Sequence, residues 1–249
     1  MKTLLDVRNI SKRFGGLHAV ENFSFAIEKN TIIGLIGPNG AGKTTAFNLI
    51  THFLPRNEGS IFFQEKNLKK KPPYALIRHG IARTFQQIRI FPELTVRENV
   101  LLSLSWKYDS WWKSFLLQDE SEENATAYKL LSEVHLEKHR DEKAGNLSYG
   151  QSKLLEMVRT IATGAELILF DEPAAGVNPP MLNTVKKLIR NLKAQGKTIF
   201  IIEHNMPFLM EMAEEIIVME NGKFLCRDVP TKIQKDIRVL EAYLGGSGF

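Results

Sequence analysis

Three glycines, a lysine and two threonines stand close together in GPNGAGKTT, residues 37–45. A glycine, four residues and then Gly-Lys-Thr form the pattern of a loop that cradles phosphates. Gly37, Gly40 and Gly42 let the backbone curl, so several N–H groups can converge on phosphate oxygens. We expect Lys43 to reach the β- and γ-phosphates and Thr44 to bind Mg²⁺. The loop predicts a purine nucleotide, held also by Pro38, Asn39, Ala41 and Thr45.

Two adjacent acids end an apolar run in LILFDEP, residues 167–173. In open α/β sheets, ligands gather at the carboxyl ends of the strands. We expect Asp171 to be a Mg²⁺ partner, directly or through water, and Glu172 to orient the water that attacks the γ-phosphate and accept its proton. Acids also mark strand ends without any function. The phosphate loop in the same chain favours the functional interpretation.

A third segment, NLSYGQ at 146–151, precedes a helical pattern. Ser148 and Gln151 have the spacing of a capping box, and Gly150 leaves room for a phosphate near the exposed N–H groups of the helix start. The segment is therefore a second candidate anion site. It also separates this chain from the kinases and GTPases that share the first two motifs.

LSYGQ resembles the LSGGQ signature of the ABC ATPases, and its distance to LILFDEP matches that family. The resemblance runs from Asp6 to about Leu244. It implies an α/β fold: a P-loop NTPase (RecA-like) core, an antiparallel β subdomain and an inserted α-helical signature subdomain. We expect residues 1–91 and 165–249 to form the ATP-binding core and 92–164 the helical subdomain.

The resemblance also implies roles for five further residues. Phe14 matches the aromatic that stacks on adenine, and Val20 a residue beside the base. Gln86 in RTFQQ matches the glutamine that couples Mg²⁺ to the transmembrane partner. Asn178 lies in the D-loop, and His204 matches the histidine that contacts the γ-phosphate.

Two departures narrow the resemblance within the family. Tyr149 replaces a glycine of LSGGQ, and Asn178 stands where many relatives have aspartate. Together with RTFQ, DEPAAG and EAYLG, these residues look like the branched-chain amino-acid uptake ATPases.

The family geometry implies a head-to-tail dimer of this chain with an identical or homologous ATPase. Each ATP, with its Mg²⁺, would lie between residues 37–45 of one chain and Ser148, Tyr149, Gly150 and Gln151 of the other. Transmembrane permease subunits would bind through the groove around Gln86. A substrate-binding protein would belong to the same complex, and this chain would lie at the cytoplasmic, inner face of the membrane.

The elements that must position these residues follow from periodicity. Strands are expected in 4–10, 22–28, 31–37, 59–64, 167–170 and 197–202, and a hairpin turned by Asn221–Gly222. A helix should begin at Pro179–Pro180 and close at Gly196. From Pro92 to Gly164 the pattern is helical. Strands alternating with helices favour a largely parallel sheet.

Composition agrees with such a domain. The 249 residues are 43% hydrophobic and 24% charged, and one cysteine, Cys226, favours a reducing compartment. A net charge of +5 is mild, so nucleic acid is not expected as a partner. No stretch has the roughly 20 apolar residues of a spanning helix.

Other interpretations remain open. A soluble ABC ATPase acting on DNA or ribosomes would usually carry a coiled-coil insertion or two ATPase units, and one phosphate loop is present. A regulatory module that binds nucleotide without turnover would need neither Glu172 nor His204. The cluster Trp106, Trp111 and Trp112 suits a partner's surface and ordinary packing equally.

Overall fold

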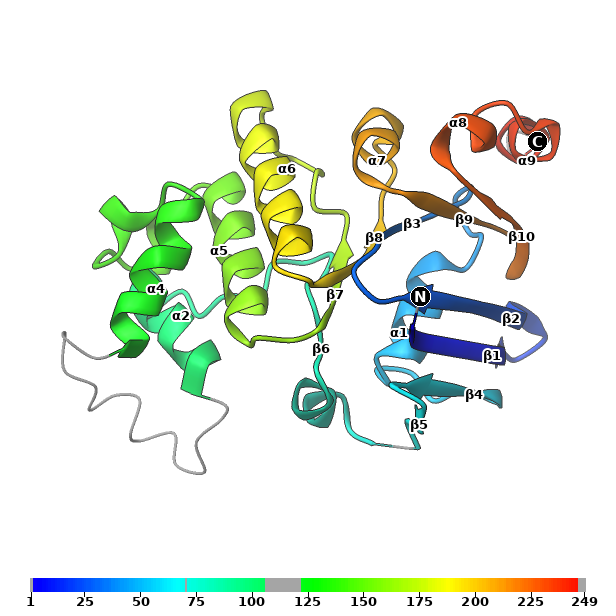
Figure 1. Ribbon diagram of the computed structural model, residues 1–249, viewed down its shortest axis with the longest axis horizontal. Helices are drawn as coiled ribbons and strands as arrows, with labels where there is room; N and C mark the ends of the chain where they lie inside the picture. Colours follow the sequence, from blue (N-terminus) through cyan, green and yellow to red (C-terminus); the bar gives the residue numbers. More distant parts are fainter. Residues whose placement is uncertain (1, 70, 106–121, 246–249) are drawn as a thin grey trace.

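The computed structural model describes residues 2–69, 71–105 and 122–245, so the tryptophan cluster lies outside the described residues. Its strands form two sheets (Figure 1). The four-stranded sheet is antiparallel, in the order β2-β1-β4-β5: Leu17–Glu28, Thr3–Phe14, Glu58–Phe63 and Lys66–Asn67. The six-stranded sheet has the order β10-β9-β3-β8-β7-β6: Lys223–Asp228, Glu215–Glu220, Ile32–Ile36, Thr198–Ile202, Leu167–Asp171 and Ile81–Arg83.

The six-stranded sheet is parallel from β9 to β6, and only β10 runs antiparallel, through the predicted Asn221–Gly222 turn. Asp171 at the end of β7 is paired with Ile202 at the end of β8. The residues that follow these two strands, which include Glu172 and His204, therefore leave the sheet side by side.

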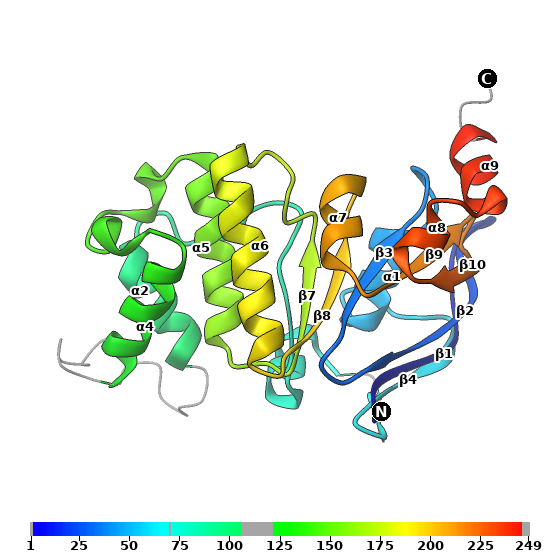
Figure 2. The ribbon, with the colours of Figure 1, turned by 45° about the horizontal axis from the view of Figure 1, so that its top comes forward.

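Helices and connecting segments make up the rest of the described chain (Figures 1 and 2). The α-helices are α1 (Lys43–Ile50), α2 (Val96–Leu104), α4 (Glu122–Glu133), α5 (Tyr149–Ala162), α6 (Pro179–Ala194), α7 (Met206–Met212), α8 (Pro230–Ile233) and α9 (Ile237–Gly245). The 3-10 helices of the described residues are η1 (Pro73–His79), η3 (Glu137–His139) and η4 (Ala144–Asn146). The described part of 92–164 contains only helices and connections, as the helical pattern predicted, while the exact subdomain boundaries stay a prediction.

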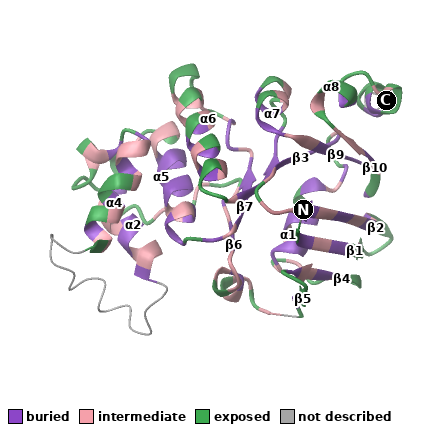
Figure 3. Cartoon of the chain, in the orientation of Figure 1, coloured by how far each residue is buried: buried purple, intermediate pink, exposed green. Residues whose placement is uncertain are grey.

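Side chains of the six-stranded sheet alternate between two hydrophobic cores. Ile32 and Ile36 of β3 face the core that also holds the buried residues of α2, α4, α5 and α6. Ile33 and Leu35 of the same strand face the second core, which α1 and the antiparallel sheet complete. Figure 3 shows the central strands buried along their length. Two covered faces explain why these strands read as continuous apolar runs in the sequence.

The observed elements match the predicted fold class, with extensions at some ends. β1 continues to Phe14, beyond the predicted strand at 4–10, through several irregularities of register with β2. Because of this extension, Phe14 lies at the end of the β1–β2 hairpin. Cys226 is buried on β10, as expected.

Candidate functional site

The phosphate loop joins β3 to α1, and its glycines are required by close contacts. Gly42 caps α1 with φ of 95°, and a Cβ there would lie 2.3 Å from the Ala19 carbonyl oxygen. A Cβ on Gly37 would lie 2.0 Å from the Met219 carbonyl oxygen. Larger residues at either position would displace the neighbouring backbone. The loop is thus held tightly between the hairpin β1–β2 and strand β9.

Lys43 is the first residue of α1 and is 6% exposed. Its ammonium group donates to the carbonyl oxygens of Gly37, at 2.6 Å, and Pro38, at 2.9 Å. Burial lowers the pKa of Lys43, and the charge of Glu172 acts in the opposite direction. A phosphate at the start of α1 would meet this cation together with the N–H groups of the helix start.

A cleft of about 580 Å³ opens over the loop and brings most of the predicted nucleotide residues together. Its lining comes from the β1–β2 hairpin, the loop, the segments after β6, β7 and β8, and the β9–β10 turn. The lining residues are Phe14, Leu17, His18, Ala19, Asn39, Gly40, Ala41, Gly42, Lys43, Thr44, Thr45, Gln86, Glu172, His204 and Asn221. Phe14 is 46% exposed, so its ring is open to a ligand.

The candidate base pairs with the candidate histidine in this cleft. Nε2 of His204 lies 3.0 Å from Oε1 of Glu172. Glu172 has φ of 51°, in the left-handed region that is unfavourable for most residues other than glycine. Its N–H donates to the carbonyl of Ile202 at 2.9 Å. Such a backbone persists when its surroundings hold it, and it turns the carboxylate from the end of β7 toward the loop.

Asp171, one residue earlier, is 2% exposed and forms a buried ion pair. Its Oδ2 lies 2.9 Å from Nη2 of Arg83 on β6. Nη1 of Arg83 donates to Oδ1 of Asn48 at 2.7 Å and to the hydroxyl of Thr51 at 2.9 Å, both from α1 or its end. Burial raises the pKa of Asp171, and Arg83 opposes that rise. Asp171 therefore lies behind the cleft and contributes to holding α1 against β6 and β7.

Three predicted nucleotide residues lie outside the lining of the cleft. Val20 is completely buried in the second core, which leaves it no surface for a base, and its neighbour Ala19 lines the cleft instead. Gly37 and Pro38 contribute the carbonyls that hold Lys43. Val20 is therefore not placed to contact the base, contrary to the prediction. The alternation of side chains along β2 directs Val20 into the second core instead.

Four lining residues were not predicted: Leu17, His18, Ala19 and Asn221. Only the tertiary contact between the two hairpins brings them to the loop. The N–H of Gly222 donates to the Ala41 carbonyl at 3.0 Å, and the N–H of Glu21 donates to Gly222 at 2.8 Å. The sequence predicts a turn at Asn221–Gly222, but it does not indicate that this turn contacts the phosphate loop.

The signature segment forms the predicted capping box at the start of α5. Ser148 accepts from the Gln151 N–H at 3.4 Å, and the Ser148 N–H donates to Oε1 of Gln151 at 2.9 Å. Tyr149 is 55% exposed. A Cβ on Gly150 would lie 2.6 Å from the sulfur of Met181 on α6. None of residues 148–151 lines the cleft of their own chain.

Asn178 caps α6, as Ser148 caps α5. Its Oδ1 accepts from the Met181 N–H at 3.0 Å. The Tyr149 ring also lies against the segment before this cap, since a Cβ on Gly176 would lie 2.6 Å from it. The signature and the D-loop are therefore in contact with each other, and neither Asn178 nor residues 148–151 line the cleft.

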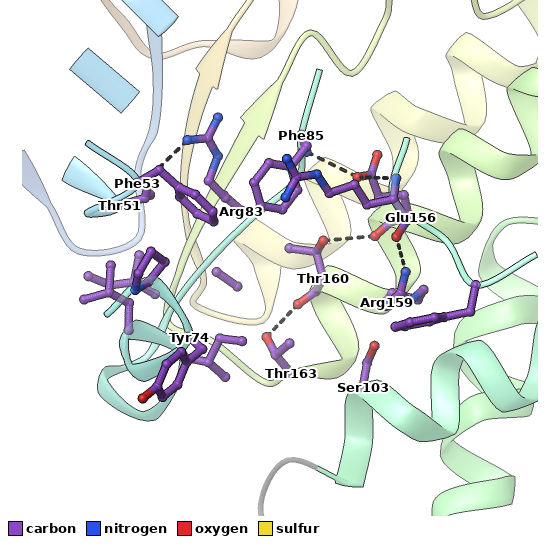
Figure 4. Close-up of a pocket in the computed structure, with 17 residues that line it drawn as sticks. Thr51, Phe53, Tyr74, Arg83, Phe85, Ser103, Glu156, Arg159, Thr160 and Thr163 are labelled. Carbon is purple, nitrogen blue, oxygen red and sulfur yellow. Dashed lines mark hydrogen bonds between the residues drawn. The ribbon is translucent and has the colours of Figure 1, made fainter. Parts of the chain in front are cut away.

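A second cavity, of about 560 Å³, lies between β6, η1, α2 and α5 (Figure 4). Its exposed aromatic residues include Phe53, Tyr74 and Phe91. The carboxylate of Glu156 on α5 accepts from the N–H groups of Phe85 and Arg89, both at 3.3 Å. Because Gln86 lies within this stretch, the wall of the cavity and the wall of the nucleotide cleft share one segment of chain.

The chain is similar to known proteins over almost its whole length. Residues 20–175 match the family model described as ABC transporter. The chain is 38% identical to the high-affinity branched-chain amino acid transport ATP-binding protein LivG of Salmonella typhimurium, over 97% of this chain and 98% of LivG. It is 35% identical to BraF of Pseudomonas aeruginosa, which has the same descriptive name, over 98% of each. The ADP conformation of MJ1267, an ATP-binding cassette of an ABC transporter, superposes with a TM-score of 0.86 at 35% identity, covering 98% and 100% of the two chains.

Proposed function

The chain belongs to the ABC transporter family as an ATP-binding cassette, and from that premise we propose that it is the Mg²⁺-dependent ATPase of an importer of branched-chain amino acids. The observation that carries the ATPase assignment is the cleft in which the phosphate loop, Glu172 and His204 meet. The amino-acid assignment rests on the names of LivG and BraF, relatives that match the chain over almost its whole length.

ATP would bind with its base against Phe14 and its phosphates over the loop, where the N–H groups of α1 and the Lys43 ammonium neutralise their charge. Glu172 would orient a water toward the γ-phosphate and accept its proton. His204, 3.0 Å from that carboxylate, would fix the carboxylate and contact the γ-phosphate. Phosphoryl transfer depends chiefly on such positioning and on charge neutralisation.

The residues present fit a Mg²⁺ ion. The Thr44 hydroxyl and the Gln86 side-chain amide supply oxygen donors in the cleft, and Mg²⁺ binds through few protein ligands together with phosphates and water. Asp171 lies behind the cleft and would contact the ion through water, because Arg83 already binds one of its oxygens. The ion would neutralise charge on the β- and γ-phosphates.

The signature supports a site shared by two chains. Ser148, Tyr149, Gly150 and Gln151 lie off the cleft of their own chain, at an exposed helix start whose N–H groups suit an anion. A head-to-tail partner, identical or homologous, would present these residues to the γ-phosphate of ATP bound here. ATP would close this dimer and hydrolysis would open it.

The cavity in Figure 4 is where we place the permease subunits. It is mostly apolar and shares the Phe85–Arg89 segment with the cleft, so a permease segment seated there would respond to movement of Gln86. Among the described residues, no helix has the length and apolar character needed to cross a membrane. The chain would act at the inner, cytoplasmic face of the membrane, in a complex that includes a substrate-binding protein.

The proposal is tested with the native complex. The chain is purified from its own membrane at native levels, its co-purifying proteins are identified, and the complex is reconstituted into vesicles. We expect two permease subunits, a second ATPase chain and ATP-dependent uptake of labelled leucine when the binding protein is added. Co-purification with ribosomes or DNA, without permeases, would contradict this proposal and indicate that the chain is a soluble ABC ATPase not coupled to transport.

A further inference from the structure

Lys153 is a buried cation on α5 that the proposed reaction does not use directly. It lies five residues after the helix cap Ser148 and is 4% exposed. A buried ammonium group costs free energy unless it is paired and hydrogen-bonded. Burial lowers the pKa of Lys153, and the carboxylates of Glu203, Glu172, Glu156 and Asp171 oppose that change. The cation is therefore embedded among the acids of the site.

The ammonium group of Lys153 binds the backbone of the catalytic turn. It donates to the carbonyl oxygen of Glu172 and, at 3.0 Å, to that of Ala175. The Ala175 N–H also donates to the Glu172 carbonyl, at 3.1 Å. Lys153 thus binds carbonyl oxygens at both ends of the short turn, residues 172–175, in which Glu172 has its left-handed conformation.

A buried carboxylate holds the same turn from its other side. Oε1 of Glu203, which is 2% exposed, accepts from the N–H of Ala174 at 2.6 Å. Oε2 of Glu203 accepts from the N–H groups of His204 and Asn205 at 2.9 and 3.0 Å. The turn after β7 and the turn after β8 are therefore fixed to each other, and Lys153 connects the turn after β7 to α5.

We propose that Lys153 is a positioning residue that couples the two ATP sites of the dimer, a proposal that rests on the shared-site arrangement above. Ser148 at the start of α5 serves the ATP of the partner chain, whereas Glu172 acts on the ATP of its own chain. A shift of α5 on engaging the partner's nucleotide moves the Lys153 ammonium group, which moves the carbonyl of Glu172 and with it the carboxylate. Occupation of one site is thereby transmitted to the base of the other.

The test compares the complex that contains Lys153→Met with the complex that contains the wild-type chain, each with its partner subunits, in ATP titrations of phosphate release. A misplaced catalytic group lowers turnover strongly without changing binding, so we expect kcat to fall about 10- to 100-fold with the Kd for ATP within about twofold. For two coupled sites the Hill coefficient has a ceiling of about 2. We expect it to lie clearly above 1 in the wild type and to fall to about 1 in the variant.

The matched control is Lys197→Met, because Lys197 also ties a carbonyl, that of Gly164 at 2.8 Å, beyond the other end of α5. It should retain wild-type turnover and the wild-type Hill coefficient. Lys153→Arg, which keeps the cation, should turn over faster than Lys153→Met. Folding is checked by thermal melting, and Lys153→Gln, which keeps an N–H donor, replaces the methionine variant if that variant does not fold.

Three results would overturn the role of Lys153: an unchanged kcat and Hill coefficient in the folded variant, a loss of ATP affinity that accounts for the lost turnover, or equal losses in the arginine and methionine variants. Absence of ATP hydrolysis by the wild-type chain with its partner subunits would instead count against the proposed function itself.

Discussion

The buried pair of Arg83 and Asp171 yields a prediction whose size follows from the structure. The two side chains are 6% and 2% exposed, with Nη2 and Oδ2 2.9 Å apart. Removing one partner of such a pair leaves an uncompensated buried charge and costs about 3–5 kcal/mol. Arg83→Met also loses the hydrogen bonds to Asn48 and Thr51, so we expect a loss at the upper end of that range.

The loss should depend on pH through Asp171. Burial already raises the pKa of this carboxyl in the folded chain, and loss of Arg83 would raise it further. A carboxyl whose folded pKa lies above its unfolded value favours folding at low pH and loses that contribution as the pH rises through the folded pKa. The deficit of Arg83→Met should therefore be small in acid and largest at neutral pH.

Urea unfolding at several pH values, together with thermal melting, measures this deficit. For a chain of this size about 3–5 kcal/mol corresponds to a fall in Tm of roughly 6–20 °C. In an Asp171→Asn background, Arg83→Met should cost clearly less, because no charge is left unpaired. A deficit that is independent of pH and equal in both backgrounds would refute the assignment of the cost to the ion pair.

Three further predictions concern the nucleotide. Glu172→Gln should bind MgATP normally and lose hydrolysis by about 100- to 10,000-fold, measured by phosphate release; unchanged turnover would remove Glu172 from its proposed role. Lys43→Ala should weaken ATP binding about 10- to 100-fold in calorimetry, and wild-type affinity in the variant would contradict the loop's role. In the wild type, ATP binding should weaken as the pH rises from neutral. This loss should begin at a lower pH than for an exposed lysine, because burial lowers the pKa of Lys43. Ser148→Ala should cost about 1 kcal/mol of stability, because the helix cap is lost. The isolated chain should still bind ATP, but light scattering should show that ATP no longer drives dimerisation. Loss of ATP binding together with dimerisation would place Ser148 in its own chain's site.

Most of the fold could be predicted from local patterns. The runs at 167–171 and 198–202 are buried on both faces, and their apolar composition is visible without a structure. The Ser148–Gln151 capping box and the Asn221–Gly222 turn were also predicted correctly, because caps and tight turns depend on residues adjacent in sequence.

The parts that escaped prediction depend on contacts between distant segments. Val20 was placed beside the base, yet alternation along a strand does not say which face meets the core, and β2 buries this residue. The sequence gives no sign that Arg83 pairs with Asp171 across 88 residues. Nothing in the sequence singles out Lys153, and only the packing of α5 against the turn after β7 shows that it is buried.

The most direct test of the shared site is a structure of the Glu172→Gln chain, with its partner ATPase subunit, bound to MgATP. We predict that the triphosphate lies between the loop around Lys43 of one polypeptide and Ser148 of the other. A triphosphate contacted by a single polypeptide throughout would contradict the account.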